Sequence, residues 1–535
     1  MGQLGLKRLV AWRERAQLLE VSDGDWRSGG HQHVLAEIGR KEVDCQLLYL
    51  YIYRYISMFT TSDLFGKFHC PRQPLSTAQA QLPTSPNELA HLFKEAFPAH
   101  QLSPTEEGDN SRQRIYSLRI TFWTFLWQVL TPGSPCTDAV LKVVAWWAGL
   151  GRHGVSPDTS PYCQARARLP MASLLDILRA TFQKAEQRVR SHWRFHDRDV
   201  IVGDGTSLSA PDTRKNQRAF PQSSNQKEGC GFPLIRLVGL FSLASGALLA
   251  FKTGNKHSHE LQLLRQLWHH LKRGDIFLAD RLFCDYVTIA WLSNGGIDSV
   301  LRLNEKRARD FRKGKRLGKY DRLVTWKKPK RKRKTATRKI WNALPEEITV
   351  RLIRYPVCTP GFRSKHIVLV TTLLDPVAYP AAELAQLYLR RWSVELFFRH
   401  IKTTLQMDTL SCLSPAMLAR EILLHLIGYN LIRGLMAETA AIHDQDVARI
   451  SFKGSVEAVH HFGQVIAQAT SRRQALQLTN DLLEALARAS VPDRPGRAEP
   501  RVKKRRHKRY PLMTRPRSAW KAKIRRPVHR KNQGA

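Results

Sequence analysis

Asp204, Asp280 and Glu395 are the residues of this 535-residue sequence best suited to chemistry on phosphorus. Three carboxylates that converge, with no Cys or His cluster beside them, form a site for a hard cation such as Mg²⁺ or Mn²⁺, which prefers oxygen ligands. Two such ions can activate a water or a 3′-hydroxyl and stabilise the leaving oxygen of an in-line attack on phosphorus. A single site of this kind can cut a phosphodiester and then join the new end elsewhere, without a covalent intermediate on the protein.

Asp204 and Asp280 each end a short apolar run that predicts a β-strand. In open mixed sheets ligands gather at the carboxyl ends of strands, so both positions suit a site. Each residue also has an ordinary explanation, because Asp-Gly is a turn dipeptide and Asp280 can pair locally with Arg281. Asp212 is a rival for the first position, but it lies in a polar loop, and we therefore favour Asp204.

Glu395 belongs to the stretch 380–410, whose composition and whose proline near the first turn predict one long helix. Tyr388, Arg391 and Lys402 share its face, because at about 100° of rotation per residue the four side chains fall within an arc of roughly 60°. A narrow stripe on a helix is normally apolar. The ordinary alternative is a solvated helix face with a favourable pair between Arg391 and Glu395 at i,i+4.

The elements around the two aspartates follow the order strand, hairpin, helix, strand, helix, strand, which is that of a ribonuclease H-like fold. The fold class is therefore α/β, with mixed α+β character. The predicted ranges are 200–206, 234–252, 260–271, 274–280, 286–293 and 299–303, with further strands at 348–355 and 367–373.

The spacing Tyr-x2-Arg-x3-Glu-x6-Lys resembles the signature of DDE transposases of the "insertion sequence four" family. The Asp204-Gly-Thr strand is similar to the first block of that family and Ala-Asp280-Arg to its second, and the resemblance covers roughly residues 112–535. It implies that Asp204, Asp280 and Glu395 bind the metal ions. It also implies DNA-binding roles for Tyr388, Arg391, Lys402 and the supporting Arg281.

The long interval between Asp280 and Glu395 fits the β-rich domain that this family inserts between its core and its helix. The interval contains the basic run Lys327–Lys334. The resemblance implies an aromatic residue here that traps a base flipped out near the cut. Trp326 is the first candidate for DNA binding of this kind and Trp341 the second, although packing inside a small β domain explains either tryptophan equally well.

Lys and Arg number 86 against 45 Asp and Glu, which gives a net charge of +41. This surplus predicts a polyanionic partner, most simply nucleic acid, because neutralising phosphates releases counterions. An anionic membrane surface is the competing partner, but no long basic amphipathic helix stands out. The eight cysteines form no C-x2-C pair, which favours a reducing cytosol. We therefore expect a cytoplasmic protein without a membrane partner or a nucleotide cofactor.

Composition and patterning divide the chain into eight predicted segments. They are a poorly defined N-terminal extension (1–74), a linker (75–111), a helical DNA-binding module (112–198), the first part of the ribonuclease H-like core (199–304), a basic β-rich insertion (305–362), the second part of the core (363–412), a helical region (413–493) and a basic tail expected to stay disordered until it meets DNA (494–535). In the helical module, Arg166 and Arg168 are expected to be exposed for docking on phosphates. An ordinary helical bundle explains this module equally well.

These features together predict a cut-and-paste transposase with two Mg²⁺ or Mn²⁺ ions in each active site. Its DNA partners would be terminal inverted repeats and target DNA. We expect a homodimer that pairs two ends, because one chain offers a single carboxylate triad and hence one site per end. Two alternatives use the same core: a metal-dependent nuclease without strand transfer, and a non-catalytic, domesticated DNA-binding relative. A basic RNA- or ribosome-associated protein is a third, for which no recognition motif stands out.

Overall fold

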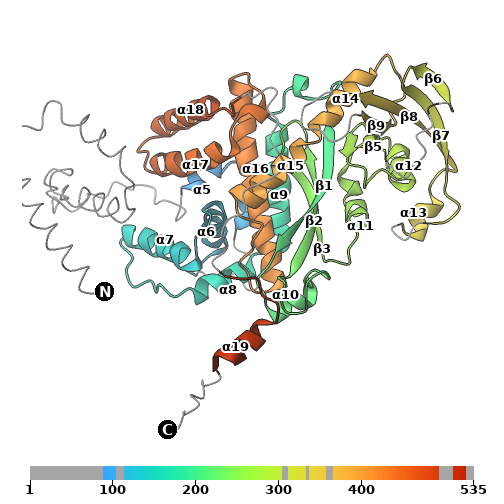
Figure 1. Ribbon diagram of the computed structural model, residues 1–535. Helices are drawn as coiled ribbons and strands as arrows, with labels where there is room; N and C mark the ends of the chain where they lie inside the picture. Colours follow the sequence, from blue (N-terminus) through green and yellow to red (C-terminus); the bar gives the residue numbers. More distant parts are fainter. Residues whose placement is uncertain are drawn as a thin grey trace, which may run out of the picture. The chain divides into compact units, whose positions relative to one another are not determined.

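The computed structural model describes residues 88–103, 114–303, 311, 313–332, 336–356, 366–492 and 510–525 (Figure 1). The predicted N-terminal extension lies outside these residues, as do most of the predicted linker and part of the basic tail. Among the residues described, no helix is both long and apolar enough to cross a membrane.

Nine strands form one mixed sheet. They are β1 (Val200–Ser209), β2 (Leu234–Ser242), β3 (Leu248–Gly254), β4 (Ile276–Ala279), β5 (Asp298–Arg302), β6 (Lys315–Gly318), β7 (Asp321–Lys327), β8 (Glu347–Pro356) and β9 (His366–Thr371), in the spatial order β3-β2-β1-β4-β5-β9-β8-β7-β6. β1 pairs antiparallel with β2 and parallel with β4, and β4 pairs parallel with β5. The half that begins at β3 and ends at β5 has the strand order of the predicted ribonuclease H-like core.

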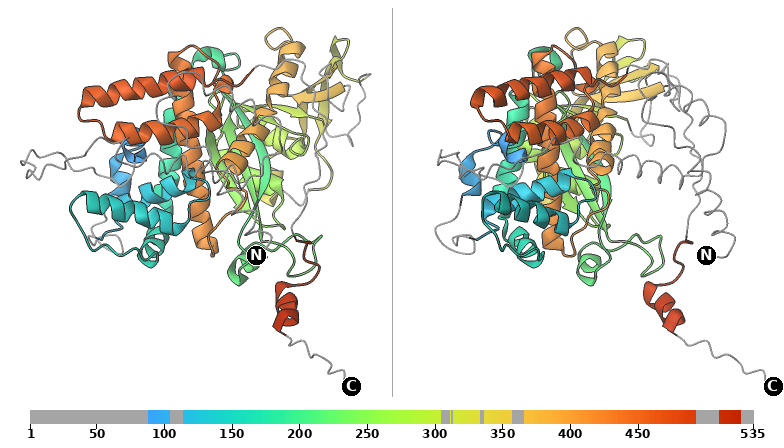
Figure 2. Two further views of the ribbon diagram at one scale, coloured as in Figure 1. Left: turned by 60° about the vertical axis from the view of Figure 1, so that its left-hand side comes forward. Right: turned by 90° about the vertical axis from the view of Figure 1, so that its left-hand side faces the viewer.

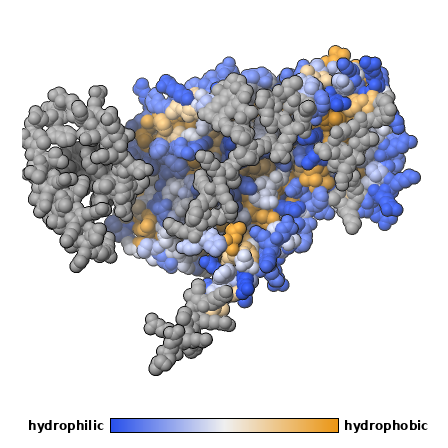
Figure 3. Space-filling model, viewed as in Figure 1, coloured by the Kyte–Doolittle hydropathy of each residue, from blue (hydrophilic) through white to orange (hydrophobic). Residues whose placement is uncertain are grey.

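The strands of the interval between Asp280 and Glu395 extend this same sheet. β9 pairs antiparallel with β5, and β8, β7 and β6 follow outward. The predicted strands at 348–355 and 367–373 correspond to β8 and β9 and are confirmed. The hairpin of β6 and β7 forms one edge of the sheet, and the surface over it is mostly hydrophilic (Figures 1 and 3).

Two apolar layers cover the sheet, because successive side chains of each strand point to opposite faces. Val200 and Val202 pack into the larger layer, whereas Ile201 between them packs into the smaller one. The larger layer contains α5 (Leu89–Phe93), α6 (Leu118–Leu130), α7 (Cys136–Gly149), α8 (Ser160–Arg168), α9 (Met171–Glu186), α14 (Ala381–Arg390), α15 (Ser393–Arg399), α16 (Pro415–Ile442), α17 (Phe452–Ala467) and α18 (Arg472–Arg488). The smaller layer contains α11 (Glu260–Arg265), α12 (Tyr286–Asn294) and α13 (Arg338–Asn342). Two further helices are α10 (Arg214–Ala219) and α19 (Arg517–Arg525).

α16 is the central helix of the larger layer, and it contacts α6, α8, α9, α17 and α18 (Figure 2). It lies within the region predicted to be helical (413–493), and it is buried around its whole circumference and not on one face alone. Asn430 therefore needs polar partners, and its side-chain amide exchanges bonds of 2.8 and 2.9 Å with the backbone of Leu248. The Tyr429 hydroxyl donates to the carbonyl of Gly246 at 2.6 Å. These bonds fix the β2–β3 hairpin, which the sequence predicted over residues 234–252.

Arg166 is not the exposed DNA contact that the sequence predicted. Its side chain is buried, and the guanidinium lies over the rings of Phe125 and Tyr162 at 4.8 and 5.0 Å. It also donates to the side-chain oxygen of Gln128, which lies 38 positions earlier in the chain. A buried cation needs such partners, so Arg166 binds α8 to α6 and holds the helical layer together.

Candidate active site

Asp204 lies inside β1, and not at its end as the sequence predicted. β1 continues to Ser209 because its pairing with β2 persists, whereas its parallel partner β4 ends opposite Gly203. Asp204 is therefore the first residue beyond the carboxyl end of the parallel ladder, where ligands gather in sheets of this type. Gly203 is required at this point, since a Cβ there would lie 2.7 Å from the ring of Phe277.

Asp280 directly follows β4, as predicted, and its carboxylate accepts the backbone N–H of Leu282 at 2.8 Å. Arg281 is exposed next to it. Glu395 comes from α15. Burial, together with the negative charges of Asp280 and Glu395, raises the pKa of Asp204 to about 6, although the Gly205 N–H and Arg391 act in the opposite direction. Both of the other predicted carboxylates are therefore near enough to Asp204 for their charges to act on it.

The stretch 380–410 is not one continuous helix. α14 ends at Arg390, a tight turn follows, and α15 leads into a π-helical turn over His400–Thr404. In the tight turn the N–H of Arg391 donates to the carbonyl of Tyr388 at 3.0 Å, and that of Glu395 to the carbonyl of Trp392 at 3.1 Å. Bonds from i to i−3 narrow the helix and place side chains three residues apart above each other.

The tight turn and the π turn bring Arg391 and Lys402 to the part of β1 that carries Asp204. One guanidinium nitrogen of Arg391 lies 3.6 Å from a carboxylate oxygen of Asp204, and the other lies 3.1 Å from one of Glu395. The ammonium of Lys402 donates to the hydroxyl of Thr206 at 3.2 Å, two residues beyond Asp204. Lys402 lies in the π turn, a feature often found at functional sites.

Tyr388 is buried beside Arg391. Burial raises the pKa of its phenol to about 12, and the charge of Asp280 adds to that effect. The phenol therefore stays neutral at physiological pH and can donate a hydrogen bond.

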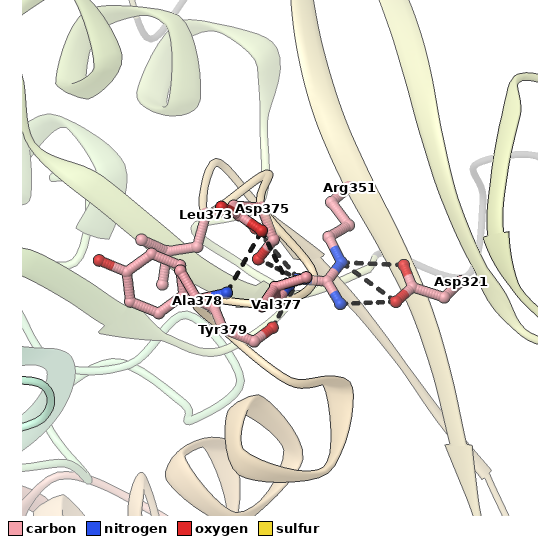
Figure 4. Close-up of polar contacts among 7 residues, drawn as sticks. All are labelled: Asp321, Arg351, Leu373, Asp375, Val377, Ala378 and Tyr379. Carbon is pink, nitrogen blue, oxygen red and sulfur yellow. Dashed lines mark hydrogen bonds and ion pairs between the residues drawn. The ribbon is translucent and has the colours of Figure 1, made fainter.

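Arg351 anchors the segment that leads into α14, and the sequence analysis missed it. Its fully buried guanidinium forms a two-pronged pair with Asp321 on β7, with contacts of 2.6 and 2.9 Å (Figure 4). It also donates to the carbonyls of Leu373, Asp375 and Tyr379 at 3.4, 3.3 and 2.7 Å. An arginine within the apolar run of β8 was the available signal, because a buried cation must find acceptors.

A second set of contacts, from residues that precede β1, holds the same segment. Arg198 donates to the hydroxyl of Tyr379 at 3.2 Å and to the carboxylate of Asp298, on β5, at 2.6 Å. His196 contacts Glu383, in the first turn of α14, at 2.8 Å. The start of α14 is therefore tied to β5, β7 and β8, which fixes where Arg391 and Glu395 project.

Trp326 and Trp341 are not brought to the carboxylates. Trp326 lies on β7, and four strands separate β7 from β1, so the two strands are about 24 Å apart at the usual spacing of about 4.8 Å. Both tryptophans are partly buried and pack against the smaller apolar layer. The ammonium of Lys328 lies 5.6 Å from the ring centre of Trp341.

The three carboxylates are the type of ligand that a hard divalent cation prefers, and a cation would offset their negative charges. As the side chains are placed, no three His, Cys, Asp or Glu groups of the described residues are close enough together to enclose an ion. Arg391 lies between two of the carboxylates and provides the positive charge there. An ion would need these carboxylates to draw closer together.

Comparisons with known proteins give matches to transposases. The family model described as "Transposase DDE domain" matches residues 195–431, a range that contains Asp204, Asp280 and Glu395. The chain is 27% identical over 406 residues to "Transposase InsG for insertion sequence element IS4" of Escherichia coli (strain K12), covering 75% of this chain and 88% of that protein. A solved structure, a piggyBac transposase synaptic complex with hairpin DNA, matches at 10% identity and a TM-score of 0.35, covering 76% of this chain and 84% of that one.

Transposases with the DDE domain generally depend on divalent metal ions. The domain match and the relative together support a DDE transposase of the insertion sequence IS4 family, a group of enzymes of metal-dependent phosphoryl transfer on DNA.

Proposed function

We propose that Asp204, Asp280 and Glu395 are the catalytic residues of this transposase and that they hold two Mg²⁺ or Mn²⁺ ions. The observation that supports the proposal is that Arg391 lies between Asp204 and Glu395, at 3.6 and 3.1 Å, while Asp280 follows the strand next to that of Asp204. When bound, the ions would activate a water or a 3′-hydroxyl and stabilise the leaving oxygen. Hydrolysis would free the transposon end, and attack by its 3′-hydroxyl on target DNA would join it by transesterification.

The basic and phenolic side chains around the triad are proposed to hold the DNA. Lys402, held by Thr206 beside Asp204, is placed for a phosphate near the reacting bond. Arg391 has the planar fork that suits two phosphate oxygens at once, and Tyr388 offers a neutral hydroxyl. Arg281, exposed after Asp280, would support the same strand.

Trp326 is proposed as a contact to DNA away from the reacting bond. It lies on β7, within the same interval as the basic run Lys327–Lys334. The distance of this strand from β1 makes it suited to a flanking segment of duplex, and Trp341 stays the second candidate.

The DNA partners are proposed to be the terminal inverted repeats of an insertion sequence and its target, as the name of the IS4 relative suggests. Each active site would process one end, so that a homodimer on paired ends performs the full reaction. We expect this reaction to take place in the cytoplasm, on the nucleoid.

The carboxylate assignment is tested by Asp204→Asn, Asp280→Asn and Glu395→Gln. Each variant should lose nicking of end-containing duplexes in Mg²⁺ by at least roughly a thousandfold while retaining end binding in a gel shift, because the carboxylates are proposed to contact metal and not DNA. Asp212→Asn is the matched control. That exposed residue contacts the amide of Gln217 at 2.8 Å, and its variant should cut normally.

Full nicking by any one of the three variants would contradict the triad. The same reactions, supplied with target DNA, also separate the transposase from a nuclease without strand transfer. The transposase should give joined products, whereas a nuclease would give free ends alone.

A further inference from the structure

The guanidinium of Arg391 bridges two of the three proposed metal ligands. Its two terminal nitrogens lie 3.6 Å from an oxygen of Asp204 and 3.1 Å from an oxygen of Glu395. The side chain is only 14% exposed, so the guanidinium is enclosed by the site and does not extend into solvent. A positive charge at this point offsets the repulsion between the carboxylates.

A divalent cation bound by the same oxygens would displace this guanidinium. Mg²⁺ requires oxygens at about 2.0–2.1 Å in near-octahedral geometry, and Arg391 already contacts one oxygen of each of these two carboxylates. The positive charges of the guanidinium and of a dication would repel each other at so short a distance. Metal binding is therefore opposed for as long as Arg391 keeps its contacts with both carboxylates.

We propose that Arg391 is an internal competitor for the metal ions, and that a DNA phosphate removes this competition by binding the guanidinium. The inference rests on the proposed function, because it takes Asp204 and Glu395 as metal ligands. It assigns Arg391 two alternative partners: the carboxylates in the free protein and a phosphate in the DNA complex. The free protein would then load metal poorly, and DNA binding would prepare the site.

The position of Arg391 in the chain permits such a change of partner. It follows α14 directly, in the tight turn between α14 and α15, and its backbone bonds involve Tyr388 and Val394 and not its own side chain. A phosphate accepts a bidentate pair from a guanidinium and so compensates for the lost carboxylate contacts. By thermodynamic linkage the effect is reciprocal: DNA must raise metal affinity by the same factor by which metal raises DNA affinity.

The test measures Mn²⁺ binding to the full chain by electron paramagnetic resonance, with and without a short 5′-phosphorylated duplex. Arg391→Gln should bind Mn²⁺ roughly tenfold more tightly than the wild type in the absence of DNA. The duplex should raise the Mn²⁺ affinity of the wild type and leave that of Arg391→Gln nearly unchanged. Arg390→Gln is the matched control, because Arg390 is exposed next to Arg391 and its loss changes the net charge by the same amount.

Unchanged or weaker Mn²⁺ binding by Arg391→Gln would overturn the proposal. The double variant Arg391→Gln, Glu395→Gln distinguishes a wrong role for Arg391 from a wrong carboxylate triad. If the double variant loses Mn²⁺ binding, Glu395 is still a metal ligand. If its Mn²⁺ binding is unaltered, both the triad and the proposed competition by Arg391 are rejected. Thermal unfolding gives a second readout that does not require an active enzyme. Mn²⁺ should raise the melting temperature of Arg391→Gln by more than it raises that of the wild type, and an equal rise would count against competition.

Discussion

At the scale of single residues, the site is defined by charges that are close together and only partly compensated. The pKa of Asp204 reflects these charges. Burial and two neighbouring carboxylates raise this pKa while Arg391 and the N–H of Gly205 lower it, with a net rise to about 6. In a catalytic site such unfavourable charge density is what a bound cation relieves. A residue proposed to bind the metal ions is therefore also one that is expected to destabilise the folded chain.

Asp204→Asn should stabilise the chain at neutral pH in the presence of EDTA. The pKa of Asp204 is about 6 in the folded chain against an ordinary 3.8, so ionisation destabilises the folded state. The destabilisation is complete above about pH 6 and disappears as the pH falls toward 3.8. We expect a gain of about 2 kcal/mol in the free energy of unfolding at pH 7.5, which shrinks steadily below pH 6.

Urea denaturation at several pH values measures this gain, with Asp212→Asn as the exposed control. A gain that does not depend on pH would show that the effect is steric and that the carboxylate of Asp204 is not destabilised in the folded chain.

At the scale of elements, the site depends on how α14 and α15 are anchored. Arg351 fastens the segment before α14 to β7 and β8, so strands that lie far from the carboxylates decide where the signature side chains project. The interval between Asp280 and Glu395 is thus part of the scaffold of the active site. Strand β7 of this interval carries both basic residues and Asp321, the partner of Arg351.

Arg351→Met should destabilise the chain by about 3–5 kcal/mol, because it leaves the buried carboxylate of Asp321 unpaired and removes one hydrogen bond from each of three carbonyls. Urea unfolding measures the loss. Arg354→Gln, an exposed change on the same strand, should stay within about 0.5 kcal/mol of the wild type. The double variant Asp321→Leu, Arg351→Met should regain stability but not nicking, if the contacts to the carbonyls position α14. Recovery of both would mean that Arg351 matters for stability alone.

The sequence predicted the elements more reliably than their junctions. Both aspartate strands, the hairpin over 234–252 and the helical region that contains α16 follow from local periodicity and turn chemistry. The tight turn at Arg391 and the π turn at Lys402 do not, because a good helix-forming composition permits all three helical geometries. The burial of Arg166 depends on Gln128 from another helix, and the length of β1 depends on pairing with β2. Such contacts between distant positions have no local signature.

At the scale of the whole molecule, we expect the net positive charge to determine when two copies of the chain associate. The net charge of +41 opposes the approach of a second copy until DNA neutralises it. Among the described residues, the β6–β7 hairpin adds to this charge at one edge of the sheet with Lys315, Arg316, Arg322 and Lys327. We therefore expect a monomer in free solution and a dimer on paired ends.

Light scattering with and without DNA that carries two ends tests this expectation. The mass should correspond to one chain without DNA and to two chains with it, and fragments with a single end should be cut slowly. A complex of one chain and one end that cuts at full rate would contradict the dimer and favour a simple nuclease.

The most direct test of the central claim locates the metal on the polypeptide itself. Fe²⁺ that replaces Mg²⁺, in the presence of ascorbate and peroxide, generates hydroxyl radicals that cleave the backbone beside the bound ion. The account predicts fragments that end near Asp204, Asp280 and Glu395, all suppressed by excess Mg²⁺ and by Asp204→Asn. Cleavage elsewhere in the chain, or cleavage at these positions that persists in Asp204→Asn, would contradict a metal site built from these three carboxylates.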